Sequence, residues 1–139
     1  MAVRFFTEDV AFSLPCPRKA STWIKEAIKK EKGQPGELNY IFCSDRHLLS
    51  LNQQYLRHDT LTDIITFDYS EGKEDISGDI YISIDRVGEN AIRFKVPFEE
   101  ELHRVMAHGV LHLLGYKDKT PADKALMRKK EEACLSLRK

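Results

Sequence analysis

The sequence predicts an α+β fold in which a mixed four-stranded sheet packs against helices. Several segments carry apolar residues at helical spacing, and short segments rich in aromatic and β-branched residues alternate with them. Strands joined through helices imply parallel pairing, whereas two strands near the middle of the chain are close enough to pair antiparallel. With 139 residues, 42% of them hydrophobic, the chain is expected to form a single domain, 1–139, with its own core.

The first half of the chain contains two predicted strands and two predicted helices. A short strand at 3–6 (VRFF) precedes a loop with two prolines. A helix follows at 19–32, where apolar residues recur at helical spacing and a glycine lies just past the end. The segment 37–43 (ELNYIFC) is typical of a strand. The next residues, 44 or 45, can cap a helix that runs to about Leu56.

The second half contains the two central strands and three more helices. Strands are predicted at 64–69 (IITFDY) and 78–84 (GDIYISI), with a loop between them. A helix at about 86–95 stops before a proline, and a long helix follows at 98–114. The last helix begins after Thr120, with proline in its first position and aspartate three residues after the cap, as in a capping box.

Composition excludes several classes of protein. The formal net charge is zero, with 22 basic and 22 acidic residues, so any nucleic-acid surface must come from local clustering. The three cysteines form no CxxC pair, which argues against a disulfide framework or a cysteine zinc site and favours a reducing compartment. No apolar run resembles a signal peptide or approaches the roughly 18 residues of a membrane span. We therefore expect a cytoplasmic protein without a membrane partner.

The segment MAHGVLHLLGYKDKT, 106–120, contains the candidate functional site. His108 and His112 are four apart on the predicted long helix, so both imidazoles can face one ion. Gly115 can end the helix in the left-handed conformation and reverse the chain, which returns Asp118 to the open side of the metal. Two nitrogens and one carboxylate oxygen leave a fourth position for water, as in catalytic zinc sites.

Other interpretations of this spacing stay open at this point. A histidine pair four apart can be a surface or core pair, and Asp118 can be a solvated loop charge. Metzincin proteases place a glutamate general base directly after the first histidine, but that position is Gly109 here, which cannot take a proton from water. A non-haem iron oxygenase also uses two histidines and one carboxylate, although nothing else in the pattern favours it.

Three segments resemble the YbeY family of bacterial ribosomal-RNA maturation factors. HGVLHLLGY, 108–116, is similar to the family motif H-G-x-L-H-L-x-G-Y-D-H, and LNQQYLRHDTLTDIITFDY, 51–69, resembles its upstream segment. SGDIYIS, 77–83, is similar to its L-G-D-I-x-I strand, and Met127 and Glu131 loosely follow its C-terminal pattern. The resemblance covers roughly residues 38 to 135 in the family's order.

The resemblance implies a zincin-like, metal-bearing helix and a metal-dependent, single-strand-specific endoribonuclease. The implied role is ribosomal RNA processing, especially at the 3′ end of small-subunit RNA, together with ribosome quality control. The implied partners are ribosomal RNA and the small ribosomal subunit or its proteins. The implied cofactor is one divalent ion, zinc first of all, which the family holds with three histidines.

Two departures from the family pattern affect the site. His108 and His112 carry over, but Asp118 occupies the position of the third histidine. A carboxylate is an acceptable zinc ligand, yet it lowers the net charge of the centre from about two to about one, which favours a harder ion such as manganese or weaker activation of water. The family's upstream arginine aligns with Leu56, so Arg57 is a catalytic candidate from charge and proximity alone.

The expected mechanism is attack of metal-activated water on a phosphodiester, with Arg57 as a second positive group on the phosphate. His58 is a reserve metal ligand, and Asp79 is either a ligand-orienting carboxylate or a plain strand aspartate. Basic residues cluster in the first and last helices, with glutamates nearby, and charge alone indicates solvated faces. These cations are Lys25, Lys29, Lys30, Lys32, Lys124, Arg128, Lys129 and Lys130, and the glutamates are Glu26, Glu31, Glu131 and Glu132. The alternative function is a non-catalytic ribosome-assembly factor with a structural or vestigial metal site.

Overall fold

A computed structural model describes residues 2–56, 62–71 and 74–138. Its four strands are β1 (Ala2–Thr7), β2 (Pro35–Cys43), β3 (Ile64–Asp68) and β4 (Ile76–Ser83). They form one sheet in the order β1-β2-β4-β3, in which β1–β2 and β2–β4 are parallel and β3–β4 is antiparallel. The predicted mixed four-stranded α+β fold is confirmed, and β3 is an edge strand.

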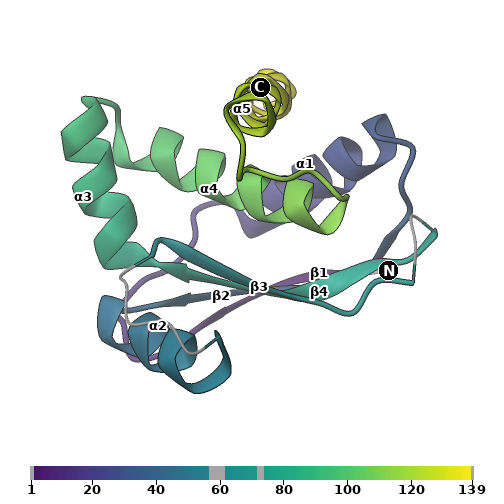
Figure 1. The fold of residues 1–139 in the computed structure, drawn as a ribbon. Helices are drawn as coiled ribbons and strands as arrows, with labels where there is room; N and C mark the ends of the chain where they lie inside the picture. The colour runs from purple at the N-terminus through teal and green to yellow at the C-terminus, as the bar shows by residue number, and fades with distance from the viewer. Residues whose placement is uncertain (1, 57–61, 72–73, 139) are drawn as a thin grey trace.

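The helices occupy both faces of this sheet. They are α1 (Pro17–Lys30), α2 (Asp45–Leu51), α3 (Ile84–Phe94), α4 (Phe98–Leu113) and α5 (Pro121–Ser136), and a π-helical turn, η1 (Asn52–Leu56), follows α2. Figure 1 shows α1 and α4 over one face of the sheet, α5 above α4 and farther from the strands, and α2 on the opposite face. No helix within the described ranges combines the length and apolar character needed to cross a bilayer.

The principal core lies between the sheet and the helices α1 and α4. Its fully buried large side chains include Ile24 and Ile28 of α1, Tyr40 of β2, Ile80 of β4 and Met106 of α4. The Tyr40 hydroxyl is satisfied in this apolar setting because it donates to the Met106 carbonyl oxygen at 2.9 Å. A smaller cluster of Cys43, Leu48 and Ile65 forms under α2 on the other face. The core therefore holds α4 firmly against the strands.

Helix ends follow the local signals in the sequence. Thr120 accepts a hydrogen bond from the Asp123 amide at 3.0 Å, and the Asp123 carboxylate accepts one from the Thr120 amide at 3.3 Å. This is the predicted capping box of α5. Ser44 caps α2 by accepting from the His47 amide at 3.1 Å. The predicted helix to about Leu56 is confirmed in extent, although its last part differs in type: α2 ends at Leu51 and the π-helical turn η1 continues to Leu56.

Candidate metal centre

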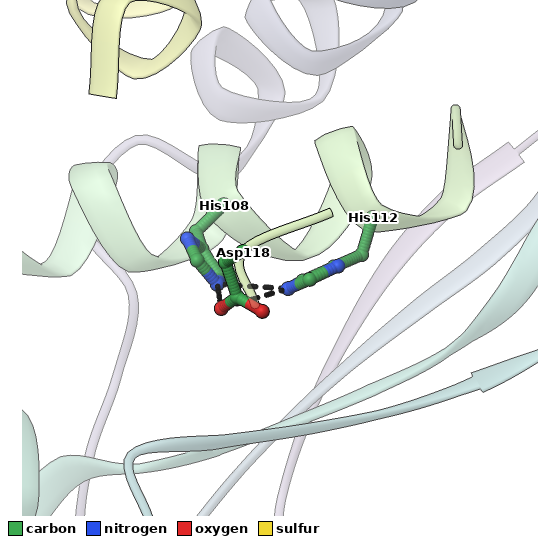
Figure 2. Close-up of side chains that lie close together, drawn as sticks. All are labelled: His108, His112 and Asp118. Atoms are coloured by element: carbon green, nitrogen blue, oxygen red, sulfur yellow. Dashed lines mark hydrogen bonds and ion pairs between the residues drawn. The ribbon is translucent and has the colours of Figure 1, made fainter. Parts of the chain in front are cut away.

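His108 and His112 lie one turn apart on α4 and direct their Nε2 atoms to the same point. These two atoms are 2.9 Å apart, and the Asp118 Oδ2 atom lies 3.3 Å from His108 Nε2 and 3.4 Å from His112 Nε2. Figure 2 shows the carboxylate between the two rings, on the side of α4 that faces the strands. The structure thus brings together the three predicted ligands from a helix and the turn that follows it.

The turn after α4 places Asp118 opposite the histidines. Gly115 has φ +104°, a conformation that a side chain would strain. The Gly115 amide donates to the His112 carbonyl and the Tyr116 amide donates to the Leu111 carbonyl, both at 3.0 Å, which is the hydrogen-bond pattern of a Schellman motif. The chain reverses here, as the glycine predicted, and reaches the open side of the histidine pair three residues later.

The second nitrogen of each imidazole already has an acceptor. His108 Nδ1 lies 2.6 Å from Glu131 Oε2, and His112 Nδ1 lies 3.0 Å from the Tyr116 carbonyl oxygen. Because a carboxylate and a carbonyl only accept, each Nδ1 carries the hydrogen and donates it. When both rings are neutral, as metal binding requires, their Nε2 lone pairs face Asp118, so that three electron-pair donors meet at one point.

This donor set fits a divalent metal ion. All three ligand atoms lie within 4.8 Å of one another. In a tetrahedral zinc site with bonds of about 2.05 Å, ligand atoms are roughly 3.3 Å apart, and the observed separations are close to that value. Two imidazole nitrogens and one carboxylate oxygen suit zinc, and the oxygen also suits harder ions such as manganese. The identity of the ion stays a prediction.

Glu131 of α5 lies beside the candidate site, although charge patterning predicts a solvated side chain at this position. It is only 8% exposed and lies against His108, while its Oε1 atom accepts from Arg104 Nη1 at 3.3 Å. Such a carboxylate fixes the tautomer and the orientation of a metal-binding histidine. Two signals point to it: it lies between the buried Met127 and Cys134 on α5, and the family's C-terminal pattern includes a glutamate there.

Electrostatics around His108 favour positive charge. Burial by itself lowers the pKa of His108, but the hydrogen bond that His108 donates to Glu131 and the charges of Glu131, Asp118 and Asp63 outweigh it and raise that pKa. Burial raises the pKa of the Asp63 carboxyl, and the charge of His108 opposes that rise. Asp63 directly precedes β3, so the start of the edge strand adds a third acidic side chain, after Asp118 and Glu131, within electrostatic range of the site.

The structure also explains why no glutamate follows the first histidine. Gly109 faces the sheet, and a Cβ atom there would lie 2.9 Å from Ile64 Cδ1 and 2.9 Å from Ile80 Cγ2. A glutamate at this position would have to displace these isoleucines and bring a carboxylate into the apolar contact between α4 and the strands. The helix is therefore packed in a way that is incompatible with the metzincin arrangement.

The remaining predicted residues are distributed differently. Arg57, the catalytic candidate, and His58, the reserve ligand, lie outside the described residues. His103, five residues before His108 on α4, packs edge-on against Trp23 with ring centroids 5.5 Å apart. Asp79 does not orient a metal ligand: it accepts from Asn39 Nδ2 at 3.0 Å and from the Tyr69 hydroxyl at 3.3 Å. Asp79 is therefore a strand aspartate within the sheet.

Comparison with known proteins agrees with this geometry. The family model described as endoribonuclease YbeY matches residues 7–138. A Flavobacterium psychrophilum protein named endoribonuclease YbeY is 58% identical over 132 residues, which cover 95% of this chain and 94% of that protein. A Cytophaga hutchinsonii protein of the same name is 56% identical over 135 residues, with 97% and 94% coverage.

The fold is also similar to a solved structure. The solution structure of TM1509 from Thermotoga maritima matches with a TM-score of 0.67 and 31% identity, over 97% of this chain and 87% of that one. The family-model match spans nearly the whole chain and includes the helix with both histidines, the turn with Asp118 and the helix with Glu131. This chain therefore belongs to the endoribonuclease YbeY family.

Proposed function

We propose that this protein is a metal-dependent endoribonuclease that cleaves single-stranded RNA by hydrolysis at the site of His108, His112 and Asp118. The observation that carries the proposal is the convergence of these three ligand atoms within 4.8 Å in a chain of this family. A bound divalent ion would supply Lewis-acid chemistry, because it lowers the pKa of a water molecule and stabilises negative charge on a phosphate.

The residues of the chain have distinct roles in this proposal. His108 and His112 present neutral nitrogens to the ion, and their orientation is held by Glu131 and by the Tyr116 carbonyl. Asp118 contributes a negative charge, so the centre is less positive than one with three histidines. Arg57 stays a candidate for binding the phosphate, on the basis of its charge and its place in the sequence.

We also propose the substrate and the setting. Ribosomal RNA is the expected substrate, with maturation of the small-subunit 3′ end and ribosome quality control as the processes. The expected partners are the small ribosomal subunit or its proteins, in the cytoplasm. These proposals are supported by membership of the family and by the motifs shared with it.

The test is cleavage of a labelled single-stranded RNA and of its duplex by the zinc-loaded and manganese-loaded protein. We expect cleavage of the single strand, and its loss after chelation or in the double variant His108→Ala/His112→Ala. The control is His47→Ala, which removes a histidine from α2 on the other face of the sheet and should leave cleavage unchanged. A metal-loaded protein that binds small subunits but cleaves no RNA contradicts the proposal and favours a non-catalytic assembly factor.

A further inference from the structure

A cavity of about 450 Å³ opens beside the candidate metal centre, between the turn after α4 and helix α5. His108 and Asp118 form one side of it, and Lys124 and Arg128 of α5 form another. The same cavity therefore contains two of the three ligands and two cationic side chains. A group bound at the metal centre would lie within a space that these cations also line.

The two cations share one face of α5. They are four residues apart, a spacing that places side chains next to each other on a helix, with Cβ atoms roughly 5–6 Å apart. Both residues are exposed, whereas Met127 and Glu131 on the adjoining face are buried. Lys124 and Arg128 can therefore reach a ligand in the cavity without any change in the packing of α5.

Other cations near this helix are already paired. Lys130 Nζ lies 3.0 Å from Glu31 Oε2, and Arg104 binds Glu131 and Glu132. Lys124 and Arg128 form no such ion pair with any residue in the part of the chain that the structure describes. Lys124 and Arg128 also line the cavity, unlike Lys129 and Lys130, so they are the basic residues of α5 positioned to neutralise an anion at the site.

The acidic groups in the cavity have partners of their own. Glu131 binds both Arg104 and His108, and Asp118 lies against the two histidines. These two carboxylates therefore form no direct ion pair with Lys124 or Arg128 that would neutralise their charge. An arginine binds phosphate oxygens with its planar fork of N–H groups and a lysine acts as a point charge, so this pair suits a phosphodiester backbone without sequence preference.

We propose that Lys124 and Arg128 bind phosphates of the RNA strand. These phosphates neighbour the one that would be cleaved beside His108 and Asp118, so that the strand follows α5 across the site. That the anion is RNA rests on the proposed function. Charge patterning alone predicts that the basic residues of this helix form one solvated cluster. In the structure these basic residues differ in position, because among those of α5 only Lys124 and Arg128 line the cavity with the ligands.

The test compares two double variants of equal charge. Lys124→Gln/Arg128→Gln removes the proposed phosphate contacts. Arg93→Gln/Lys129→Gln removes one arginine and one lysine that do not line this cavity. Binding of the zinc-loaded full chain to a fluorescent 2′-O-methyl oligouridylate is followed by anisotropy at several salt concentrations, and the oligonucleotide is checked for cleavage afterwards.

Each phosphate contact with a single strand contributes about 0.7 to the slope of log affinity against log salt concentration. We expect the first double variant to lose about 1.4 from that slope and roughly tenfold or more in affinity at low salt. The control variant should keep the slope of the unmodified protein. Thermal unfolding should be unchanged in both variants, because all four side chains are exposed.

Three results would overturn the inference: an unmodified protein that does not bind the oligonucleotide, an unchanged slope in the first variant, or an equal loss in both variants. An equal loss would mean that only overall charge matters. An unmodified protein that binds RNA through these residues but cleaves none contradicts the proposed function alone. One that cleaves RNA while the first variant keeps its slope contradicts this inference alone.

Discussion

Replacement of Glu131 with glutamine tests whether the buried carboxylate behind His108 strengthens metal binding. The carboxylate accepts the His108 Nδ1 hydrogen over 2.6 Å, and its side chain is only 10% exposed, so solvent screens its charge weakly. Glutamine keeps the size and an acceptor oxygen but removes the negative charge. The imidazole would become a poorer electron donor to an ion at Nε2.

The expected size of the effect follows from these contacts. Loss of such a partner typically weakens metal affinity 10- to 100-fold. Glu131→Gln keeps a neutral acceptor, so we expect about tenfold, or ~1.4 kcal/mol. Glu131→Ala also removes the acceptor and leaves Arg104 with one carboxylate partner fewer, so we expect roughly 100-fold, or ~2.7 kcal/mol.

The assay is competition for Zn²⁺ between the protein and a chromophoric chelator, with thermal unfolding measured in parallel. Glu132→Gln is the matched control, because Glu132 accepts from the same Arg104 at 2.8 Å but is exposed and does not contact His108. Its metal affinity should equal that of the unmodified protein. Equal Zn²⁺ affinity in folded Glu131→Gln and the unmodified protein would refute the reasoning.

Three further changes probe the ligand set, the core and the helix packing. Asp118→His raises the net charge of the candidate metal centre by about one. The affinity for Zn²⁺ should therefore rise relative to that for Mn²⁺ in direct titrations, and the pH–rate profile should move to lower pH. An unchanged metal preference together with an unchanged profile would count against the role of Asp118. His103 is 6% exposed and burial lowers its pKa to about 4 from 6.5, so the unfolded chain binds more protons as pH falls through that window. The free energy of unfolding should therefore fall by up to ~3 kcal/mol between pH 7 and 4 from this residue, and urea titrations of His103→Leu should lack that component; an identical pH dependence would contradict it. Gly109→Ala places a Cβ 2.9 Å from isoleucine atoms of β3 and β4 and should lower stability by about 1 kcal/mol, because overpacking exceeds the gain in helix propensity. Gly88→Ala on α3 should instead raise the melting temperature, because an added Cβ there meets no atom closer than 4.0 Å. A lower melting temperature for Gly88→Ala than for Gly109→Ala would show that packing at Gly109 does not limit stability.

Most element boundaries could be predicted because they depend on local chemistry. Thr120 and Ser44 cap their helices with side-chain oxygens, and Gly115 adopts the left-handed turn that its position suggests. The change from α-helix to π-helix after Leu51 could not be predicted in this way. A π-helical turn such as Asn52–Leu56 has no spacing of apolar residues that distinguishes it from the α-helix before it.

The candidate site likewise combines local contacts, which could be predicted, with a contact between residues far apart in sequence, which could not. His108, His112 and Asp118 lie within eleven consecutive residues, so helix periodicity and one glycine turn suffice to bring them together. The contact between Glu131 and His108 joins residues 23 apart in sequence. It requires α5 to pack against α4 in one particular orientation, and charge patterning along α5 predicts a solvated glutamate instead.

The order of strands and helices and the ligand spacing on the long helix follow from the sequence alone, because they depend on residues that interact within a few turns of chain. The likeness to one family is carried by the motifs themselves. Tertiary packing alone fixes which face of α5 lies against the candidate metal centre, that Glu131 is buried there, and that Lys124 and Arg128 line the cavity with the ligands. The physical reason is that burial and pairing of a charged side chain depend on the helix packed against it. The orientation of α5 against α4 depends in turn on the packing of the whole core.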